Sequence, residues 1–415
     1  MKVLKVGDKV VSVNNQLLSA PNGGGTTPGA PGDITFYDYD GTIVTSWTLA
    51  ELATKTALPD YPSHEGLTCQ GWNWSLADLK TTNRKMNVGA MYITDDGKTR
   101  IYIRLEEGRT SPMLGVCPNG TVTVDWGDGT TPDTLTGTST TTVKWTPNHA
   151  YAAPGEYVIK LTVNGTMGFY GTSDSNQSSA ILRYSSTSDN RNYVYRNSIE
   201  KIELGSSVTS IASNAFYNCY SLASITIPDS VTSIESNAFR YCYSLTSITI
   251  PDSVTSIESN AFSPCYSLLS ITIPNGVTKI GSNAFGYCYS LPSITIPDSV
   301  TSIESNAFRY CSSLTSITIP DSVTSIENNA FGYCYSLASI TIPNGVTKIG
   351  SVAFFNCYSV AFYDFSNHTS VPTLSNANAF SSIAADCQIR VPASLVDAWK
   401  TATNWSTYAD HIVGV

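Results

Sequence analysis

Hydrophobic positions recur every 23 residues between Ile199 and Val360, and residues 230–252 show the unit in full. Its apolar positions are Val231, Ile234, Ala238, Phe239, Cys242, Leu245, Ile248 and Ile250. At the end of the unit, apolar residues alternate with Ser247 and Thr249, which is the period of a strand with one buried face. Pro251 then ends this strand, because proline has no N–H for a ladder hydrogen bond.

The next coil is completed by a second extended piece at Val254 to Ile257 and by a turn at 260–262. One cysteine marks each unit, at the same spacing throughout: Cys219, Cys242, Cys265, Cys288, Cys311, Cys334 and Cys357. A fixed period of this length is the signature of a solenoid, in which neighbouring coils bury one another's apolar edges. The pattern therefore predicts a mainly β rod whose stability belongs to the stack rather than to one unit.

The repeat also carries a recognisable phrase, I-P-x-S-V-T-S-I-x-x-x-A-F-x-x-C-x-S-L-x-S-I-T, which can be followed from Ile227 to Thr249 and in its copies. This phrase resembles the BspA-like subclass of leucine-rich repeats, and the resemblance covers about half of the chain. It implies a leucine-rich-repeat solenoid with a role in adhesion or recognition. It does not imply an enzyme.

The first 32 residues read as a short extended piece followed by a Gly/Pro-rich linker at 20–32. We expect residues 1–32 to form an N-terminal anchor to a larger assembly. A frayed terminus followed by a linker explains the same residues equally well.

Residues 33–85 are expected to form a small α/β unit. A strand at Ile34–Tyr37 precedes an Asp-Gly turn, which is a hairpin signal. Two short helices are predicted at Leu49–Ala57 and Leu76–Lys80, and Thr48 is placed to cap the first of them.

Residues 86–166 read as all-β. We expect a hairpin between 91–93 and 101–105 around an Asp-Gly turn. Downstream, W-G-D-G-T begins at Trp126 and H-x-Y-x-x-P-G-x-Y-x-V-x-L-x-V begins at His149. Both phrases resemble the PKD domain, which implies an immunoglobulin-like β-sandwich used as a spacer or binding module.

The remaining segments flank the repeats. Residues 167–198 read as an irregular connector that also caps the first coil, since an uncapped coil exposes unpaired strand edges. The solenoid itself spans 199–366. Residues 367–415 read as a degenerate repeat closed by a helical cap that begins at Pro392.

Composition narrows the class of partner. A chain of 415 residues suggests two to four domains, and only 13% of them are charged. Ser, Thr, Asn and Tyr fill the surface instead, which suits hydrogen bonding to neutral ligands. The net charge of −9 argues against nucleic acid, because phosphate binding needs a basic stripe. No run of 18 apolar residues is present, so membrane insertion is not expected.

Residues 1–9 carry scattered charges and no apolar core of a secretory signal. This favours folding in a cytosol and arrival outside by assembly into a particle. Of the ten cysteines, seven share one repeat position, which predicts a buried column of free thiols rather than disulfides.

Candidate chemistry is sparse. Asp125 and Asp128 could form a calcium or catalytic pair, but their Gly-rich context favours a tight turn. The four histidines have no metal-ligand spacing, and no P-loop, G-x-S-x-G or H-E-x-x-H is present. The recurring glutamates form a surface row: Glu235, Glu258, Glu304 and Glu327. We therefore expect no catalytic residues, no metal and no cofactor.

Two rows of residues are candidates for ligand binding. Hydroxyl side chains leave the core face of each strand, at Thr226, Thr249, Thr272, Thr295, Thr318 and Thr341, each with a serine two residues before it. Tyrosines follow the cysteines, at Tyr220, Tyr243, Tyr266, Tyr289, Tyr335 and Tyr358. A tyrosine has a flat apolar face and a polar tip, which suits a sugar ring. The alternative is a ladder of stacked rings that only stabilises the rod.

Together these features predict a non-enzymatic phage virion protein, of the tail or a decoration, that recognises a host cell-surface glycan or protein through the solenoid. The resemblance to gut phage and prophage surface proteins implies this carrier, with contact to other virion proteins through the N-terminus and a location on the virion surface after synthesis in the host cytoplasm. A BspA-like adhesin on a bacterial cell surface is the first alternative. A purely structural stalk or fibre is the second.

Overall fold

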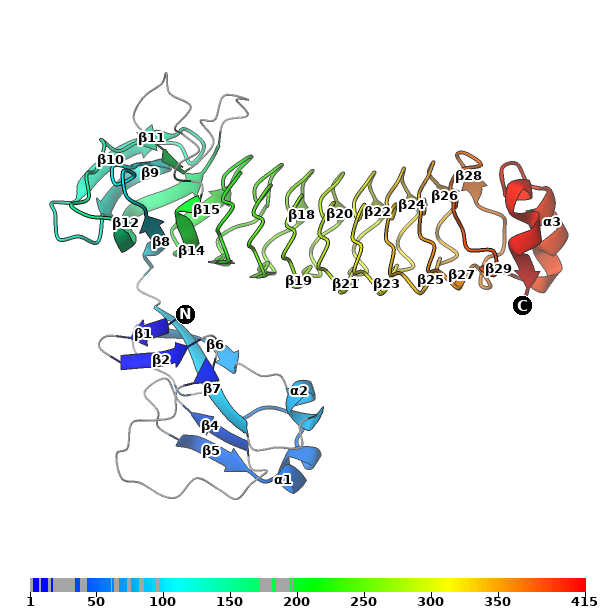
Figure 1. The fold of residues 1–415 in the computed structure, drawn as a ribbon, viewed down its shortest axis with the longest axis horizontal. Helices are drawn as coiled ribbons and strands as arrows, with labels where there is room; N and C mark the ends of the chain where they lie inside the picture. Colours follow the sequence, from blue (N-terminus) through cyan, green and yellow to red (C-terminus); the bar gives the residue numbers. More distant parts are fainter. Residues whose placement is uncertain are drawn as a thin grey trace. The chain divides into compact units, whose positions relative to one another are not determined.

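The computed structural model describes residues 3–6, 9–13, 16–17, 34–37, 43–60, 62, 67–72, 76–81, 86–94, 97–171, 181–183, 195 and 197–415. The chain divides into two compact units, Met1–Gly97 and Lys98–Val415 (Figure 1). All of the predicted linker at 20–32 and much of the predicted connector at 167–198 lie outside the described residues.

The first unit contains two small sheets and two helices. An antiparallel sheet contains β1 (Val3–Val6), β2 (Lys9–Val13) and β3 (Gln16–Leu17). A mixed sheet has the order β5 (Ile43–Trp47), β4 (Ile34–Tyr37), β7 (Met86–Thr94) and β6 (Leu67–Trp72). The helices are α1 (Leu49–Thr54) and α2 (Leu76–Thr81).

Helix α1 begins where its sequence provides a capping box. The Thr48 hydroxyl accepts a hydrogen bond from the Glu51 N–H, and the Glu51 carboxylate accepts one from the Thr48 N–H at 2.8 Å. Hydrogen bonds that the Thr48 N–H and hydroxyl donate to the Glu51 carboxylate lower the pKa of that group. The helix ends three residues earlier than predicted, because Lys55 already has extended backbone angles.

The predicted hairpin between 91–93 and 101–105 is wrong. Strand β7 pairs with β4 and β6, whereas β8 (Thr99–Leu105) pairs with strands of the second unit. Alternation alone made the two strands look like partners, but Val88 lies in the core of the first unit and Ile101 in that of the second. The boundary therefore falls at Gly97, not before residue 86.

The second unit starts with a β-region. Its strands are β8, β9 (Met113–Asp125), β10 (Asp133–Thr138), β11 (Lys144–Trp145), β12 (Gly155–Phe169) and β13 (Leu182–Arg183). The first half of β9 pairs with β11 and β13, and its second half with β10 and β12. The assignment of this region to a PKD-type sandwich stays a prediction.

The predicted solenoid is confirmed, with two parallel ladders along the stack (Figure 1). The first ladder contains β14 (Ile199–Glu203), β16 (Ser224–Thr226), β17 (Ser247–Thr249), β19 (Ser270–Thr272), β21 (Ser293–Thr295), β23 (Ser316–Thr318), β25 (Ser339–Thr341), β27 (Phe362–Asp364) and β29 (Gln388–Val391). The second contains β15 (Val208–Ile211), β18 (Ser256–Ile257), β20 (Lys279–Ile280), β22 (Ser302–Ile303), β24 (Ser325–Ile326), β26 (Lys348–Ile349) and β28 (Thr373–Leu374). Paired residues are 23 positions apart, as in Ile225, Ile248 and Ile271, so every coil repeats the same environment.

Two columns fill the interior. Phenylalanine rings stack from coil to coil, with centroids 5.3 Å apart between Phe239 and Phe262. The repeat cysteines are free and buried, and each thiol from Cys242 to Cys357 donates to a carbonyl of the preceding coil, as Cys242 does to Phe216 at 3.3 Å. The column of buried thiols is therefore confirmed.

The β-region covers the first coil of both ladders. Strand β8 pairs antiparallel with β14, and the end of β12 pairs parallel with β15. Strands from residues 99–105 and 167–169 thus occupy the edges that the first coil would otherwise expose. The sequence had indicated residues 167–198 alone as this cap.

The last coil is closed by a short helical segment. It contains η2 (Ala393–Leu395), α3 (Val396–Thr401), η3 (Trp405–His411) and β30 (Ile412–Gly414), which pairs with β29. Trp399 and Trp405 are fully buried and pack against Phe365. The Trp405 indole N–H donates to the Pro372 carbonyl at 2.7 Å, which fixes the cap on the stack.

Candidate functional site

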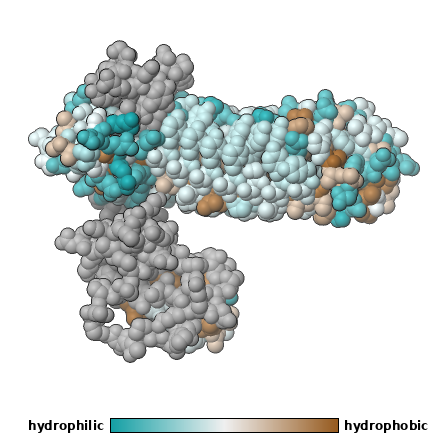
Figure 2. Space-filling view, viewed as in Figure 1, coloured by the Kyte–Doolittle hydropathy of each residue, from teal (hydrophilic) through white to brown (hydrophobic). Residues whose placement is uncertain are grey.

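The first ladder presents a face of serine and threonine, called here the Ser/Thr face. In β17 the pattern is exposed, buried, exposed for Ser247, Ile248 and Thr249, and the same alternation recurs along the stack. Of the predicted threonines, Thr249, Thr272, Thr295, Thr318 and Thr341 are exposed, and Thr226 is half-buried next to the β-region. In Figure 2 the solenoid surface is mostly pale, in keeping with a face of uncharged polar residues.

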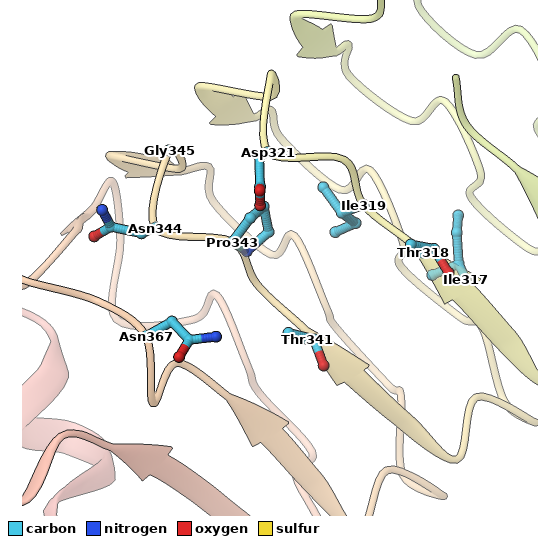
Figure 3. Close-up of a pocket in the computed structure, with 9 residues that line it drawn as sticks. All are labelled: Ile317, Thr318, Ile319, Asp321, Thr341, Pro343, Asn344, Gly345 and Asn367. Carbon is cyan, nitrogen blue, oxygen red and sulfur yellow. The ribbon is translucent and has the colours of Figure 1, made fainter. Parts of the chain in front are cut away.

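One hollow of about 650 Å³ lies on this face, between β23 and β25 (Figure 3). It brings together the two predicted threonines of those strands, and sequence reasoning missed the other residues that line it. The lining residues are Ile317, Thr318, Ile319, Asp321, Thr341, Pro343, Asn344, Gly345 and Asn367. Isoleucine and proline side chains provide apolar surface, and hydroxyl, amide and carboxylate groups provide the polar partners. That combination suits a neutral ligand with many hydroxyl groups.

The position of the hollow follows from local departures from the repeat. The first ladder divides into hydrogen-bonded groups, and β23 and β25 belong to different groups. In the coil of β25 the turn reads Pro-Asn-Gly in place of Pro-Asp-Ser. A Cβ on Gly345 would lie 2.4 Å from the Asp321 carbonyl oxygen, so the two turns approach more closely than any side chain allows. The same triplet occurs at 274–276, where a Cβ on Gly276 would meet its nearest atom only at 3.4 Å, so the triplet alone could not have located the hollow.

Asn344 fixes the rim of the hollow. Its side-chain amide oxygen accepts hydrogen bonds from the Thr369 N–H at 2.9 Å and from the Thr369 hydroxyl at 3.3 Å. Beneath it, His368 is buried and its Nε2 lies 3.1 Å from the Ile342 carbonyl oxygen. Burial lowers the pKa of His368, which keeps the imidazole neutral at neutral pH. Among the lining residues, Asp321 is the acidic one and none is basic.

The predicted tyrosines form a second feature, the tyrosine column, which comprises Tyr220, Tyr243, Tyr266, Tyr289, Tyr335 and Tyr358. Their rings stack on one another, with centroids 4.6 Å apart and planes 2° apart for Tyr243 and Tyr266. Stacking occupies the ring faces inside the column, so edges and hydroxyls remain at the surface there. This geometry favours the stabilising ladder for the interior of the column. Ring faces without a partner from the column occur at its two ends and where it is interrupted.

A second stack, called here the inner column, lies beside the tyrosine column and comprises Tyr287, Tyr310 and Tyr333, each directly before a repeat cysteine. Tyr310 stacks on Tyr287 and Tyr333, and the guanidinium of Arg309 lies 4.8 Å from the Tyr310 ring centroid. In the tyrosine column, burial is the main cause that raises the pKa of Tyr243 to about 12, and the neighbouring tyrosines raise it further. This phenol therefore stays protonated at neutral pH and can donate hydrogen bonds.

The acidic candidates of the β-region have structural partners. Asp125 accepts from the Gly127 N–H, and Asp128 accepts from the N–H and hydroxyl of Thr130. The second Asp128 oxygen lies 2.7 Å from Nε2 of His149. Gly127 and Gly129 have φ of 78° and 81°, as the tight-turn interpretation requires. Within the described residues no group of three metal-ligating side chains is found. Nor does the described part of the chain include a helix long and apolar enough to cross a membrane.

Comparisons with solved structures find other leucine-rich repeat proteins. A leucine-rich repeat protein of T. pallidum is 34% identical, over 39% of this chain and 78% of that one, with a TM-score of 0.37. One from Bacteroides ovatus is 19% identical, over 65% of this chain and 70% of that one, with a TM-score of 0.41. The pneumococcal vaccine antigen PcpA is 15% identical, over 61% and 83%, with a TM-score of 0.25. The curated proteins provide no match.

The family comparison is decisive for the repeats. The sequence profile described as "BspA type Leucine rich repeat region" matches six copies, over residues 187–315 and 301–397. These ranges cover just over half of the 415 residues and include every coil of the solenoid. The chain therefore belongs to the BspA-type leucine-rich repeat family.

Proposed function

We propose that the solenoid is a non-enzymatic recognition module that binds cell-surface glycans on its Ser/Thr face. Membership of the BspA-type family supports a binding role built on the repeats. The observation that carries the choice of ligand is the hollow between β23 and β25, where Thr318, Thr341 and Asp321 surround an apolar floor. Sugars present hydroxyl groups at their edges and C–H groups on their faces, and both kinds of surface find partners there.

The test uses the full chain, fluorescently labelled, on intact cells of candidate host bacteria. We expect binding that is lost when periodate has oxidised the surface glycans. The double variant Asp321→Ala with Thr341→Val should bind at least tenfold more weakly. Its matched control changes the same repeat positions three coils earlier, Asp252→Ala with Thr272→Val, and should bind like the wild type.

Equal binding by both double variants would remove the hollow as the site. Binding that resists periodate would contradict a glycan receptor and favour a protein receptor. A correctly folded chain that binds no candidate host would favour the stalk or fibre interpretation.

The carrier is a separate part of the proposal. We assign the protein to a phage virion, with residues 1–32 as the attachment to other virion proteins, on the sequence resemblance alone. A gene surrounded by tail genes and detection of the protein in purified particles would support this assignment. Detection on the bacterial cell surface instead would favour the adhesin alternative.

A further inference from the structure

The tyrosine column is interrupted at one coil. Tyr220, Tyr243, Tyr266 and Tyr289 stack in sequence with centroids 4.6 to 5.0 Å apart. The next repeat places Ser312 at this position, and the column resumes with Tyr335 stacked on Tyr358 at 5.1 Å. One ring of the stack is thus replaced by a hydroxymethyl group. We call this position the Ser312 gap.

The spacing of the coils sets the width of the gap. Tyr289 and Tyr335 are two coils apart, and coils in a parallel ladder are about 4.8 Å apart, so the two rings are separated by about 9–10 Å. Elsewhere in the column the same two-coil space holds one ring, as Tyr243 lies between Tyr220 and Tyr266. The gap therefore has room for one ring. A pyranose, whose axial hydrogens stand above and below its mean plane, can contact both tyrosine faces across this width.

The inner column forms a wall beside the gap. The Tyr310 ring is perpendicular to that of Tyr289, at 88° with 6.5 Å between centroids, and Tyr333 is perpendicular to Tyr335 at 90° and 6.0 Å. The Arg309 guanidinium lies 4.8 Å from the Tyr310 centroid and 5.4 Å from that of Tyr333. A cation thus lies against both rings of the wall.

The floor of the gap is small and polar. The Ser312 hydroxyl donates to the Tyr289 carbonyl oxygen at 3.4 Å, within the space that a tyrosine ring fills in the other coils. Tyr289 is 38% exposed, so the rim of the gap reaches solvent.

These surroundings discriminate between possible occupants. Four tyrosine rings around one space resemble the aromatic cages that hold quaternary ammonium groups, but the Arg309 cation beside Tyr310 and Tyr333 repels such a guest. A neutral sugar escapes this repulsion. Its two C–H faces can contact Tyr289 and Tyr335, and its hydroxyl groups point toward water, Ser312 and the phenol groups at the rim.

We propose that the Ser312 gap holds a single pyranose ring, which takes the place of the missing tyrosine in the stack. This inference rests on the proposed glycan-binding function and adds a second subsite to it. Ser312 and Tyr335 precede β23 and β25 in the chain, and the hollow is formed by residues within and after these two strands.

The decisive variant is Ser312→Tyr, which fills the gap with the same side chain that the other coils of the column have at this position. The full chain is mixed with a panel of methyl pyranosides of glucose, galactose, mannose and N-acetylglucosamine, and binding is read from saturation-transfer NMR. We expect wild type and Ser312→Ala to transfer saturation to the ring hydrogens of at least one pyranoside. Ser312→Tyr should lose the share of that transfer that the Asp321→Ala, Thr341→Val variant retains, with a melting temperature no lower than that of the wild type.

The other outcomes separate this inference from the proposed function. Undiminished transfer in Ser312→Tyr overturns the gap as a subsite. If only the Asp321→Ala, Thr341→Val variant loses transfer, sugars bind in the hollow alone and the proposed function stands without the gap. Stronger binding of phenol or of choline than of any pyranoside overturns the assignment of the occupant. A wild type that binds no pyranoside also overturns it, while the periodate experiment on cells decides the proposed function independently.

Discussion

The turn at Val352 is the place where a single substitution should stabilise the solenoid measurably. In the preceding coils the same position is asparagine in the left-handed conformation, as for Asn306 and Asn329 with φ of 59° and 57°. Val352 has φ of 50°. This region costs a residue with a Cβ roughly 1–2 kcal/mol, and asparagine reaches it more easily than a β-branched side chain does.

Valine in place of asparagine at position 352 also leaves a hydrogen bond unmade. Asn283 donates its side-chain N–H to the amide oxygen of Asn260 at 2.6 Å, and Asn329 donates to that of Asn306 at 2.9 Å. The amide oxygen of Asn329 is buried and, within the described coils, has no donor. The next coil offers Val352 at that position. An intramolecular hydrogen bond of this kind contributes about 0.5–1.5 kcal/mol.

We therefore expect Val352→Asn to raise the free energy of unfolding by about 2 kcal/mol, from about 1 kcal/mol of relieved strain and about 1 kcal/mol of hydrogen bonding. Urea denaturation of the full chain, followed by far-UV circular dichroism, should show a higher midpoint at an unchanged slope. Val352→Asp is the matched control, since it has the same shape and accepts the left-handed turn but sets an oxygen against the Asn329 oxygen. An unchanged or lower midpoint for Val352→Asn would refute the reasoning, and an equal gain for Val352→Asp would refute its hydrogen-bond part.

Two further predictions follow from the coils. Gly345→Ala should lower the melting temperature and weaken glycan binding, because its Cβ would meet the Asp321 carbonyl oxygen at 2.4 Å. Gly276→Ala changes the same repeat position, where the nearest atom would be 3.4 Å away, and should be tolerated. Equal effects of the two variants would contradict the close approach at Gly345. Alkaline pH should destabilise the solenoid, since burial raises the pKa of the Cys288 thiol from 9.0 to about 12. A group whose pKa is higher in the native state loses its contribution to the free energy of unfolding as pH rises between these two values. Urea midpoints should be constant below about pH 8 and fall from about pH 9 upward, with a shallower fall for Cys288→Ala; midpoints independent of pH would contradict this.

The repeats were predictable because the same residue types recur at the same positions in successive coils. The burial of Phe239, Cys242 or Ile248 is therefore indicated by several copies of each position. The caps were not, since pairing of β8 with β14 joins segments about a hundred residues apart, without any periodic signal. The same lack of long-range information produced the false hairpin between β7 and β8. Alternation reports that a strand has a buried face, but not which core buries it.

The candidate site divides along the same line. The exposure of the Ser/Thr face follows directly from strand alternation, so Thr318 and Thr341 were found. The hollow depends on a backbone shift near Gly345, whose size no pattern of residue types reports. For the tyrosines, the sequence provides their spacing but not the side-chain torsions that turn each ring toward the next. Ser312 was visible as the exception in the column, and acquires meaning only with the stacking geometry.

The ladder that runs through β8, β14 and the following coils also has a mechanical meaning. Its hydrogen bonds point from coil to coil, so the interfaces carry tension between the β-region and the C-terminal cap in series, and one interface can break while the others hold. Each strand contributes only about three residues to an interface, and each coil contacts only its neighbours. A coil that detaches releases 23 residues, or roughly 76–83 Å of extended chain, while the remaining coils stay folded. Under load the solenoid is thus an extensible tether that lengthens by one coil at a time.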